Sequence, residues 1–361
     1  MLRSGYILTR RSDLVWFLAL PIVAVAIALL CHQWLPGIAV ASVGLWITIP
    51  HHFATWFRIY GLSEDWKRWK GRLILGPIVI AIVSLVAIKW FPLTLLALTV
   101  LWDHQHSLMQ QHGIGRIYDF KARTGTTTTG KFDLMLHCFL YVNLFLTAPL
   151  FVNVWLRELH RWHLPISAAS VVTIQQISCA ALASYLVVYV GHIIWSLRKG
   201  HAVNPIKFLF FAASYFLWYF TSWHSDSFLV FGIAHRMMHG IQYIVIVHSY
   251  VRRKSSDPGQ QIGWFPRLAW KGNVKWFLVA GLFYAALYQI IVAAPLDQFG
   301  FGVVNFMAIY EAVPELGIAG MSEGMSYDLF AATIISAAPL THYYFDSFIW
   351  KVRQPQTQEG L

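Results

Sequence analysis

Residues 14–31 read LVWFLALPIVAVAIALLC, eighteen consecutive residues without a charged side chain. An α-helix needs about twenty apolar residues to cross the roughly 30 Å hydrocarbon core of a bilayer. The stretch is therefore predicted to be a transmembrane helix. Basic residues precede it and no small-residue cleavage site follows it, so we expect a retained anchor and not a removed signal peptide.

The composition of the whole chain indicates the same class of protein. Of its 361 residues, 57% are hydrophobic and 12% are charged, whereas a soluble domain carries about 25% charged residues. This balance excludes a soluble enzyme, a disordered chain and a disulfide scaffold. We predict an all-α, polytopic transmembrane helical bundle with about ten spans, forming a single domain over residues 1–361. The predicted spans are Leu14–Cys31, Leu35–Phe57, Leu73–Trp90, Pro92–Gln111, Phe132–Leu156, Ile166–Leu197, Ile206–Ser222, Phe228–Tyr250, Trp276–Ala294 and Leu329–Trp350.

The formal charge of +11 is explained by the orientation of these spans and does not indicate nucleic-acid binding. Lys and Arg gather in alternate short loops, which the positive-inside rule places in the cytoplasm. Both termini are therefore predicted to be cytoplasmic. Residues 299–325 are apolar but contain Glu311, Glu315 and Glu323, and we expect them to form an interfacial or re-entrant segment on the outer side.

Histidine is the most informative residue type, because its 16 copies equal those of Asp and Glu combined. Ionisable residues inside a membrane are costly and indicate functional sites. At 1.5 Å per residue, the histidines of four spans lie at similar depth, about 10–20 Å from the cytoplasmic basic residues. Scattered structural histidines have no reason to agree in depth, so we predict one metal site. The candidate ligands are His51, His52, His104, His106, His235, His239, His342 and Asp346.

The spacing within the spans adds to this prediction. His235 and His239 stand at i and i+4 and share one helix face, as do His342 and Asp346. Seven imidazoles exceed the three or so protein ligands of a catalytic zinc site, so we expect two metal ions. Imidazole-rich sites suit iron, zinc, copper or nickel. Further candidates are the possible ligands His112, His248 and Asp103, and the glutamines Gln110 and Gln242, expected to hydrogen-bond the ligating imidazoles.

These residues resemble those of the histidine-rich integral-membrane di-iron enzymes, namely fatty-acyl desaturases, alkane hydroxylases, and carotenoid hydroxylases and ketolases. The HxxxH element of that group is present as His235–His239, whereas its HxxHH box is absent and His51-His52 is the nearest adjacent pair. A weaker likeness is to the carotene-cleaving dioxygenases of the Brp/Blh type. The resemblance implies two iron atoms per chain, with zinc as a substitute on overexpression. The strings 239–243 and 342–346 also resemble elements of bacterial membrane proteins, which implies a multi-pass protein of a bacterial inner membrane.

The function expected from these observations is a metal-dependent oxidoreductase that activates dioxygen to hydroxylate, desaturate or cleave a lipid-soluble substrate. Its expected partners are that substrate, membrane lipids and a cytoplasmic electron donor. Two alternatives belong to other classes. Histidine clusters also line the paths of metal-ion or proton transporters, although we find no inverted repeat. A non-catalytic subunit that binds a pigment or a quinone is the other alternative, and it would keep its role without metal.

Overall fold

The computed structural model describes residues 1–225, 227–254, 274–292 and 323–361. Within these residues the secondary structure is helical, apart from short connections and one isolated bridge between Leu2 and Val203. The prediction of an all-α fold is confirmed. Of the segment expected to be interfacial or re-entrant, residues 299–322 lie outside the described residues, and Glu323 begins the helix α14.

The described chain divides into two compact units. Unit 1 comprises residues 1–34 and 108–238, and unit 2 comprises residues 35–107 and 239–361. The division passes through α5 (Pro92–Ala122) and α10 (Phe228–Lys254), so each of these helices contributes to both units.

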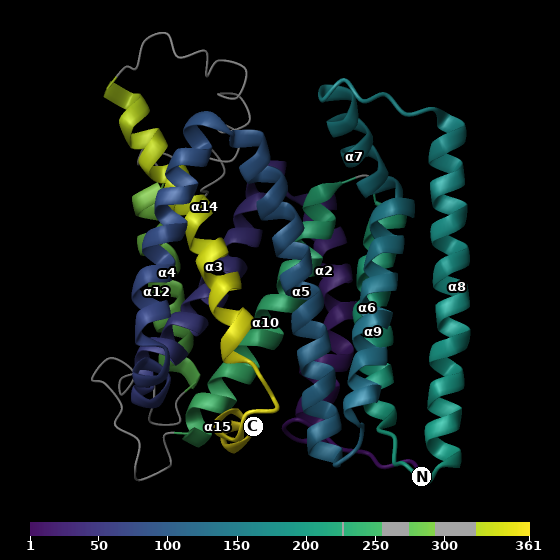
Figure 1. Cartoon of the computed structure of the whole chain (residues 1–361). Coiled ribbons are helices and arrows are strands. Elements are labelled where there is room, and N and C mark those ends of the chain that lie inside the picture. Colours follow the sequence, from purple (N-terminus) through teal and green to yellow (C-terminus); the bar gives the residue numbers. More distant parts are fainter. Residues whose placement is uncertain (226, 255–273, 293–322) are drawn as a thin grey trace. The chain divides into compact units, whose positions relative to one another are not determined.

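Unit 1 contains the first helix and the middle of the chain. Besides its parts of α5 and α10, it holds α6 and α8, which lie side by side (Figure 1), and α2, which packs on α9. Its elements are α1 (Arg10–Asp13), the π-helical turn η1 (Leu14–Ala19), α2 (Leu20–Trp34), α6 (Thr127–Thr147), α7 (Pro149–Arg161), α8 (Ala168–Arg198) and α9 (Pro205–His224).

Short polar residues set the beginnings of these helices. Thr126 and Ser167 cap α6 and α8 by accepting hydrogen bonds from backbone amides three residues later. Asn204 caps α9 by accepting from the backbone amide of Ile206, two residues later, and Pro205 stands at the first helical position. The single span predicted over Phe132–Leu156 is broken: α6 and α7 meet at Ala148 with a bend of 69°. The following proline disfavours helical geometry at Ala148, which explains the break.

Unit 2 contains the helices of the candidate site. In it α14 lies against α4 along much of its length (Figure 1), and α12 packs on α3. Buried apolar side chains of α3, α4 and α14 form one core, which contains Ile59, Leu73, Phe345 and Phe348. Its elements are α3 (Gly37–Gly61), α4 (Ser63–Trp90), α12 (Val274–Val292), α14 (Glu323–Ile349) and α15 (Pro355–Gly360), with parts of α5 and α10.

Several helices are compatible with a membrane protein. Among the described residues, four helices are long and apolar enough to cross a bilayer, or five if α6 and α7 form one broken span. The four are Arg10–Trp34, Ser63–Trp90, Ala168–Arg198 and Phe228–Lys254. Each remaining predicted span also coincides with a helix, so the helices are confirmed, whereas the number of ten crossings stays a prediction.

The core of unit 1 generates a stability prediction on α9. Phe210 is fully buried and its ring packs against Tyr118 at 5.6 Å and Phe17 at 6.3 Å. Phe210→Ala should lower the free energy of unfolding by about 3–5 kcal/mol, because it removes buried apolar surface and leaves a cavity. Phe216→Ala, on the same helix but 46% exposed, should change it by about 0.5 kcal/mol or less. Equal losses in detergent unfolding would contradict this assignment of the core.

Candidate metal centre

Four of the predicted histidines converge in unit 2 from four different helices. They are His51 on α3, His106 on α5, His239 on α10 and His342 on α14. All four are buried, with at most 5% of the residue exposed. One ring nitrogen of each histidine lies within 4.8 Å of one ring nitrogen of each of the other three. We call this set the four-histidine group.

The rings of the four-histidine group meet mostly edge to face. His51 and His342 have centroids 4.4 Å apart with an interplanar angle of 89°. His106 lies 4.8 Å from His342 and 5.0 Å from His239, at 73° and 76°. Steep angles direct ring edges, where the nitrogen atoms lie, toward neighbouring rings instead of stacking the faces.

The closest contact joins His51 Nε2 and His342 Nε2 at 2.8 Å. The other nitrogen of His51, Nδ1, lies 3.0 Å from the carbonyl oxygen of Thr48. A carbonyl oxygen only accepts hydrogen bonds, so His51 Nδ1 must carry a proton and donate it. A neutral His51 therefore has its lone pair on Nε2, facing His342.

A chain of hydrogen bonds links the proton position of His342 to Asp346. With Asp346 ionised, the Tyr243 hydroxyl donates to Asp346 Oδ1 at 2.7 Å and accepts from the Trp350 indole at 3.2 Å. It also accepts from Thr55, whose Oγ1 lies 2.6 Å away, and Thr55 Oγ1 accepts from His342 Nδ1 at 2.7 Å. His342 then has its lone pair on Nε2, whereas with Asp346 protonated the chain can reverse and His342 Nε2 donates to His51 Nε2.

With Asp346 ionised, two lone pairs face each other at 2.8 Å in a buried site, and this contact is repulsive unless a cation lies between the nitrogens. A proton would create a buried imidazolium among three other imidazoles, and burial disfavours the charged form. A metal ion fits better: with metal–nitrogen bonds of about 2.0–2.1 Å, two nitrogens at right angles on one ion are about 2.9 Å apart.

Asp346 adds a carboxylate to the edge of the group. Its Oδ2 lies 3.8 Å from both His106 Nε2 and His342 Nε2. His106 Nε2 is buried and makes no hydrogen bond with any described residue. A metal ion at this point would use that nitrogen and Oδ2 as ligands, since imidazole and carboxylate both bind first-row metals. The residues present therefore fit a metal ion.

The other predicted ligands lie in other surroundings. The ring of His52 is adjacent to the group, 4.7 Å from His51 and 4.9 Å from His342. Asp103 accepts a hydrogen bond at 2.8 Å from Tyr343, whose ring stacks on His106. His104, Gln110 and Gln242 lie at least partly buried on α5 and α10, outside the four-histidine group.

Three further candidate ligands lie against aromatic or imidazole rings. In unit 1, His235 accepts a hydrogen bond from the Trp218 indole at 2.8 Å, and His112 lies edge to face with His137 at 5.8 Å. In unit 2, His248 lies 5.4 Å from Phe277. None of the three belongs to the four-histidine group among the described residues, and their assignment as ligands stays a prediction.

Sequence reasoning missed the hydroxyl groups of Thr55 and Tyr243, which fix the tautomer of His342. The sequence contains a signal for both residues. Thr55 follows His51 by four residues and Tyr243 follows His239 by four residues, the same spacing as His342 and Asp346. Residues four apart share a helix face, so a hydrogen-bonding residue one turn after each histidine was the pattern to find.

Comparisons with known proteins find no match, because no family model, no curated protein and no solved structure matches the chain. The function is therefore argued from the site.

Removing a histidine of the group should remove the metal. His106→Ala, His239→Ala and His342→Ala should each lower the metal content of the purified protein several-fold, because ligands on separate helices cannot rearrange to close the open position. His160→Ala is the control, since His160 is exposed at the end of α7. Size-exclusion chromatography tests whether each variant is folded, and elemental analysis of the eluted protein measures its metal content. Full retention of metal in all three variants would contradict the assignment.

A subtler test concerns Thr55. Thr55→Val keeps the shape of the side chain but removes the acceptor of the His342 proton, so metal affinity should fall by about 10–100-fold. Thr48→Val is the matched control on the same helix, because His51 bonds only the backbone carbonyl of Thr48, and its hydroxyl bonds Gly44. Competition with a chelator measures both affinities. Equal affinities would show that Thr55 does not orient His342.

Proposed function

We propose that the protein is a membrane-embedded, metal-dependent oxidoreductase whose metal is bound by the four-histidine group and which acts on a lipid-soluble substrate. The observation that carries the proposal is the convergence of four buried histidines from four helices, with the Nε2 atoms of His51 and His342 2.8 Å apart. Beside an ionised Asp346, a metal ion satisfies this contact together with the nearby His106 and His239.

Iron is the proposed metal, and zinc is the expected substitute on overexpression. Four imidazoles with one carboxylate suit iron, copper or zinc. A redox-active ion would supply electron transfer to dioxygen, which zinc cannot supply. The described cysteines are free and at least partly exposed, and the four-histidine group contains no thiolate.

The four-histidine group by itself accounts for one ion. Opposite ligands of a single ion are about 4 Å apart, so a span of 4.8 Å needs only a small contraction. The two metal ions expected from the sequence would lie about 3.5–4 Å apart and need further ligands. His52 and Asp346 are the nearest candidates for the second ion, because the His52 ring is 4.9 Å from His342 and Asp346 is 3.8 Å from His106.

The chain's own residues would hold and orient the metal. The Thr48 carbonyl holds the proton of His51 on Nδ1, and Thr55 beside an ionised Asp346 would hold that of His342 on Nδ1, so that both Nε2 atoms stay available. Tyr243 and Trp350 hold the carboxylate and the hydroxyl groups in place by hydrogen bonds. The four histidines have little contact with solvent, which excludes bulk water from the reacting groups.

The surface of unit 2 supports a lipid-soluble substrate. Large apolar side chains are exposed along α4 and α12, the two helices that pack on α14 and α3. Exposed apolar faces of this length are typical of helices in contact with lipid. A substrate that reaches the site between such helices would be dissolved in the bilayer. The exposed residues include Leu75, Ile78, Val79, Ile82 and Val83 on α4, and Val279, Leu282 and Phe283 on α12.

We further propose the ten-span topology with both termini in the cytoplasm of a bacterial cell. It is supported by the order of polar residues in the site. His51 and His342 contact each other, and Thr55, Tyr243 and Asp346, which lie one turn after the histidines of their helices, form the hydrogen-bonded chain. Two such layers form only if α3, α10 and α14 run in the same direction, as the predicted second, eighth and tenth spans do.

The metal proposal predicts both content and redox behaviour. Purified protein should contain one or two first-row transition metals per chain, and iron-loaded protein reduced with dithionite should reoxidise in air with an optical change. The same treatment of His342→Ala should give no such change, because the ion is lost. Retention of metal without any redox response would favour a transporter or a binding subunit, whereas a metal-free native protein would contradict the proposal.

The topology is tested by reporter fusions. Fusions after Arg72, Lys131 and Arg353 should all report a cytoplasmic position, because each follows a basic loop. A fusion after His163, between α7 and α8, should report the outer side. An external position after Arg353 would reverse α14 relative to α3 and contradict the common direction of the site helices.

A further inference from the structure

Arg236 lies in the interior of a helix that is long and apolar enough to cross a bilayer. This helix, α10, comprises Phe228–Lys254, so Arg236 stands about 12 Å from its beginning at 1.5 Å per residue. The other two basic residues of the predicted spans, Lys89 and Lys207, each stand one residue from a span end. Since a charged side chain inside a membrane is costly, an arginine at this depth indicates a functional site.

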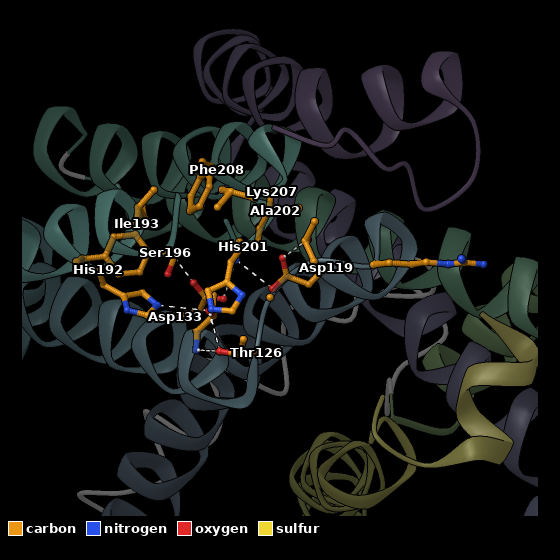
Figure 2. Close-up of a pocket in the computed structure, with 16 residues that line it drawn as sticks. Asp119, Thr126, Asp133, His192, Ile193, Ser196, His201, Ala202, Lys207 and Phe208 are labelled. Carbon is orange, nitrogen blue, oxygen red and sulfur yellow. Dashed lines mark hydrogen bonds and ion pairs between the residues drawn. The ribbon is translucent and has the colours of Figure 1, made fainter. Parts of the chain in front are cut away.

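Three basic side chains are fully buried among the described residues, and each has a carboxylate partner. In the polar pocket of unit 1, Lys207 Nζ donates to Asp119 Oδ2 and to Asp133 Oδ2, both at 3.0 Å (Figure 2). The pairs in unit 2 are Arg58 with Asp65 and Lys254 with Glu64. Arg236 differs from these three, because it is partly buried and forms no hydrogen bond or ion pair with any described residue. Its charge is therefore available to an anionic ligand.

The face of α10 beside Arg236 is open. Leu229, Gly232 and Arg236 stand at positions i, i+3 and i+7, so they share one face of the helix, and all three are partly exposed. A Cβ on Gly232 would meet no described atom within 4 Å. Side chains of a helix lean toward its N-terminus, so the Arg236 side chain extends toward Gly232. The charge of Arg236 and the unfilled space at Gly232 therefore lie side by side on one helix.

The guanidinium group and its depth limit the choice of ligand. Arginine pairs bidentately with a carboxylate or a phosphate. The phosphates of phospholipids lie in the headgroup region outside the hydrocarbon core, whereas Arg236 stands about 12 Å inside its helix. A carboxylate carries one negative charge and neutralises a single guanidinium, and charges in an apolar environment need such a partner. A carboxylic acid with an apolar chain meets both conditions.

We propose that Arg236 and the open position at Gly232 form a binding site for the carboxylate of a lipid-soluble carboxylic acid. Arg236 supplies the charge and the planar set of donors, and the partly exposed face at Leu229 and Gly232 gives the apolar chain access from the bilayer. All three residues belong to the part of α10 that lies in unit 1, and none belongs to the four-histidine group. The site is therefore independent of the metal centre.

The test measures binding of palmitic acid to the full-length protein in nanodiscs of phosphatidylcholine. Radiolabelled palmitate is titrated at alkaline pH, where its carboxyl group is ionised, and empty nanodiscs give the background. Hexadecanol, which has the same chain without the charge, is the competitor. The variants are Arg236→Gln, Arg236→Lys and Gly232→Leu. Their matched controls are Arg252→Gln, which removes an exposed cation at the end of α10, and Gly191→Leu, which fills an equally open position on α8.

Arg236→Gln should weaken palmitate binding by about 10–100-fold, because hydrogen bonds between two charged groups are lost. Gly232→Leu should weaken it by filling the space for the carboxylate. Arg236→Lys should retain part of the affinity, since it keeps the charge but not the planar fork. Binding should be unchanged in both controls, and hexadecanol should not displace palmitate. Arg236 has no ion pair to lose, so its variants should fold.

Equal palmitate affinity in all variants, or displacement of palmitate by hexadecanol, would overturn the proposal. A different result would overturn it as well. If native mass spectrometry showed that Arg236→Gln loses bound phosphatidylglycerol while palmitate binding is unchanged, Arg236 would contact a phospholipid headgroup instead of a carboxylic acid. Gly232→Leu adds a strong helix former at an open position, so its result stands even if an Arg236 variant is unstable.

Discussion

Two neutral imidazoles whose lone pairs face each other cannot rest 2.8 Å apart in an apolar interior unless a cation joins them. Beside an ionised Asp346, His51 and His342 are in this position because Thr48 and Thr55 occupy their other nitrogens. The hydrogen bonds of Tyr243, Asp346 and Trp350 then keep the protons on the outer side of the rings. The polar geometry around the four-histidine group follows from this constraint.

The residues that meet this constraint lie in two layers on the three helices α3, α10 and α14. One layer contains histidines, and the next, one helical turn later, contains Thr55, Tyr243 and Asp346. With one helix reversed, its histidine and its hydrogen-bonding residue could not both lie level with those of the other two helices. A common direction for α3, α10 and α14 requires long connections between them. Each of these helices is in fact separated from the next by other helices along the chain.

The sequence predicted the helices and all four histidines of the group, because apolar length and matched depth are one-dimensional properties. It could not choose between His235 and His239, which share a helix face one turn apart. Residues distant in the sequence separate the two histidines. The Trp218 indole donates a hydrogen bond to His235, whereas His239 packs edge to face against His51. Thr55 and Tyr243 were missed because a hydroxyl group in a span is not distinctive by itself, and only its position four residues after a histidine marks it. The break at Ala148 was not predicted because the effect of the following proline on helical geometry was not considered.

The two polar centres differ in how their charge is balanced. In unit 1, Lys207 and Arg116 neutralise Asp119 and Asp133, so that cluster is complete without a ligand. In unit 2, the four imidazoles bring no charge and the Asp346 carboxylate lies 3.8 Å from two of them. Arg58, the nearby cation, is stacked on Trp350 and paired with Asp65. A cation bound beside an ionised, buried carboxylate stabilises it, which is an electrostatic reason to expect a metal ion at this centre.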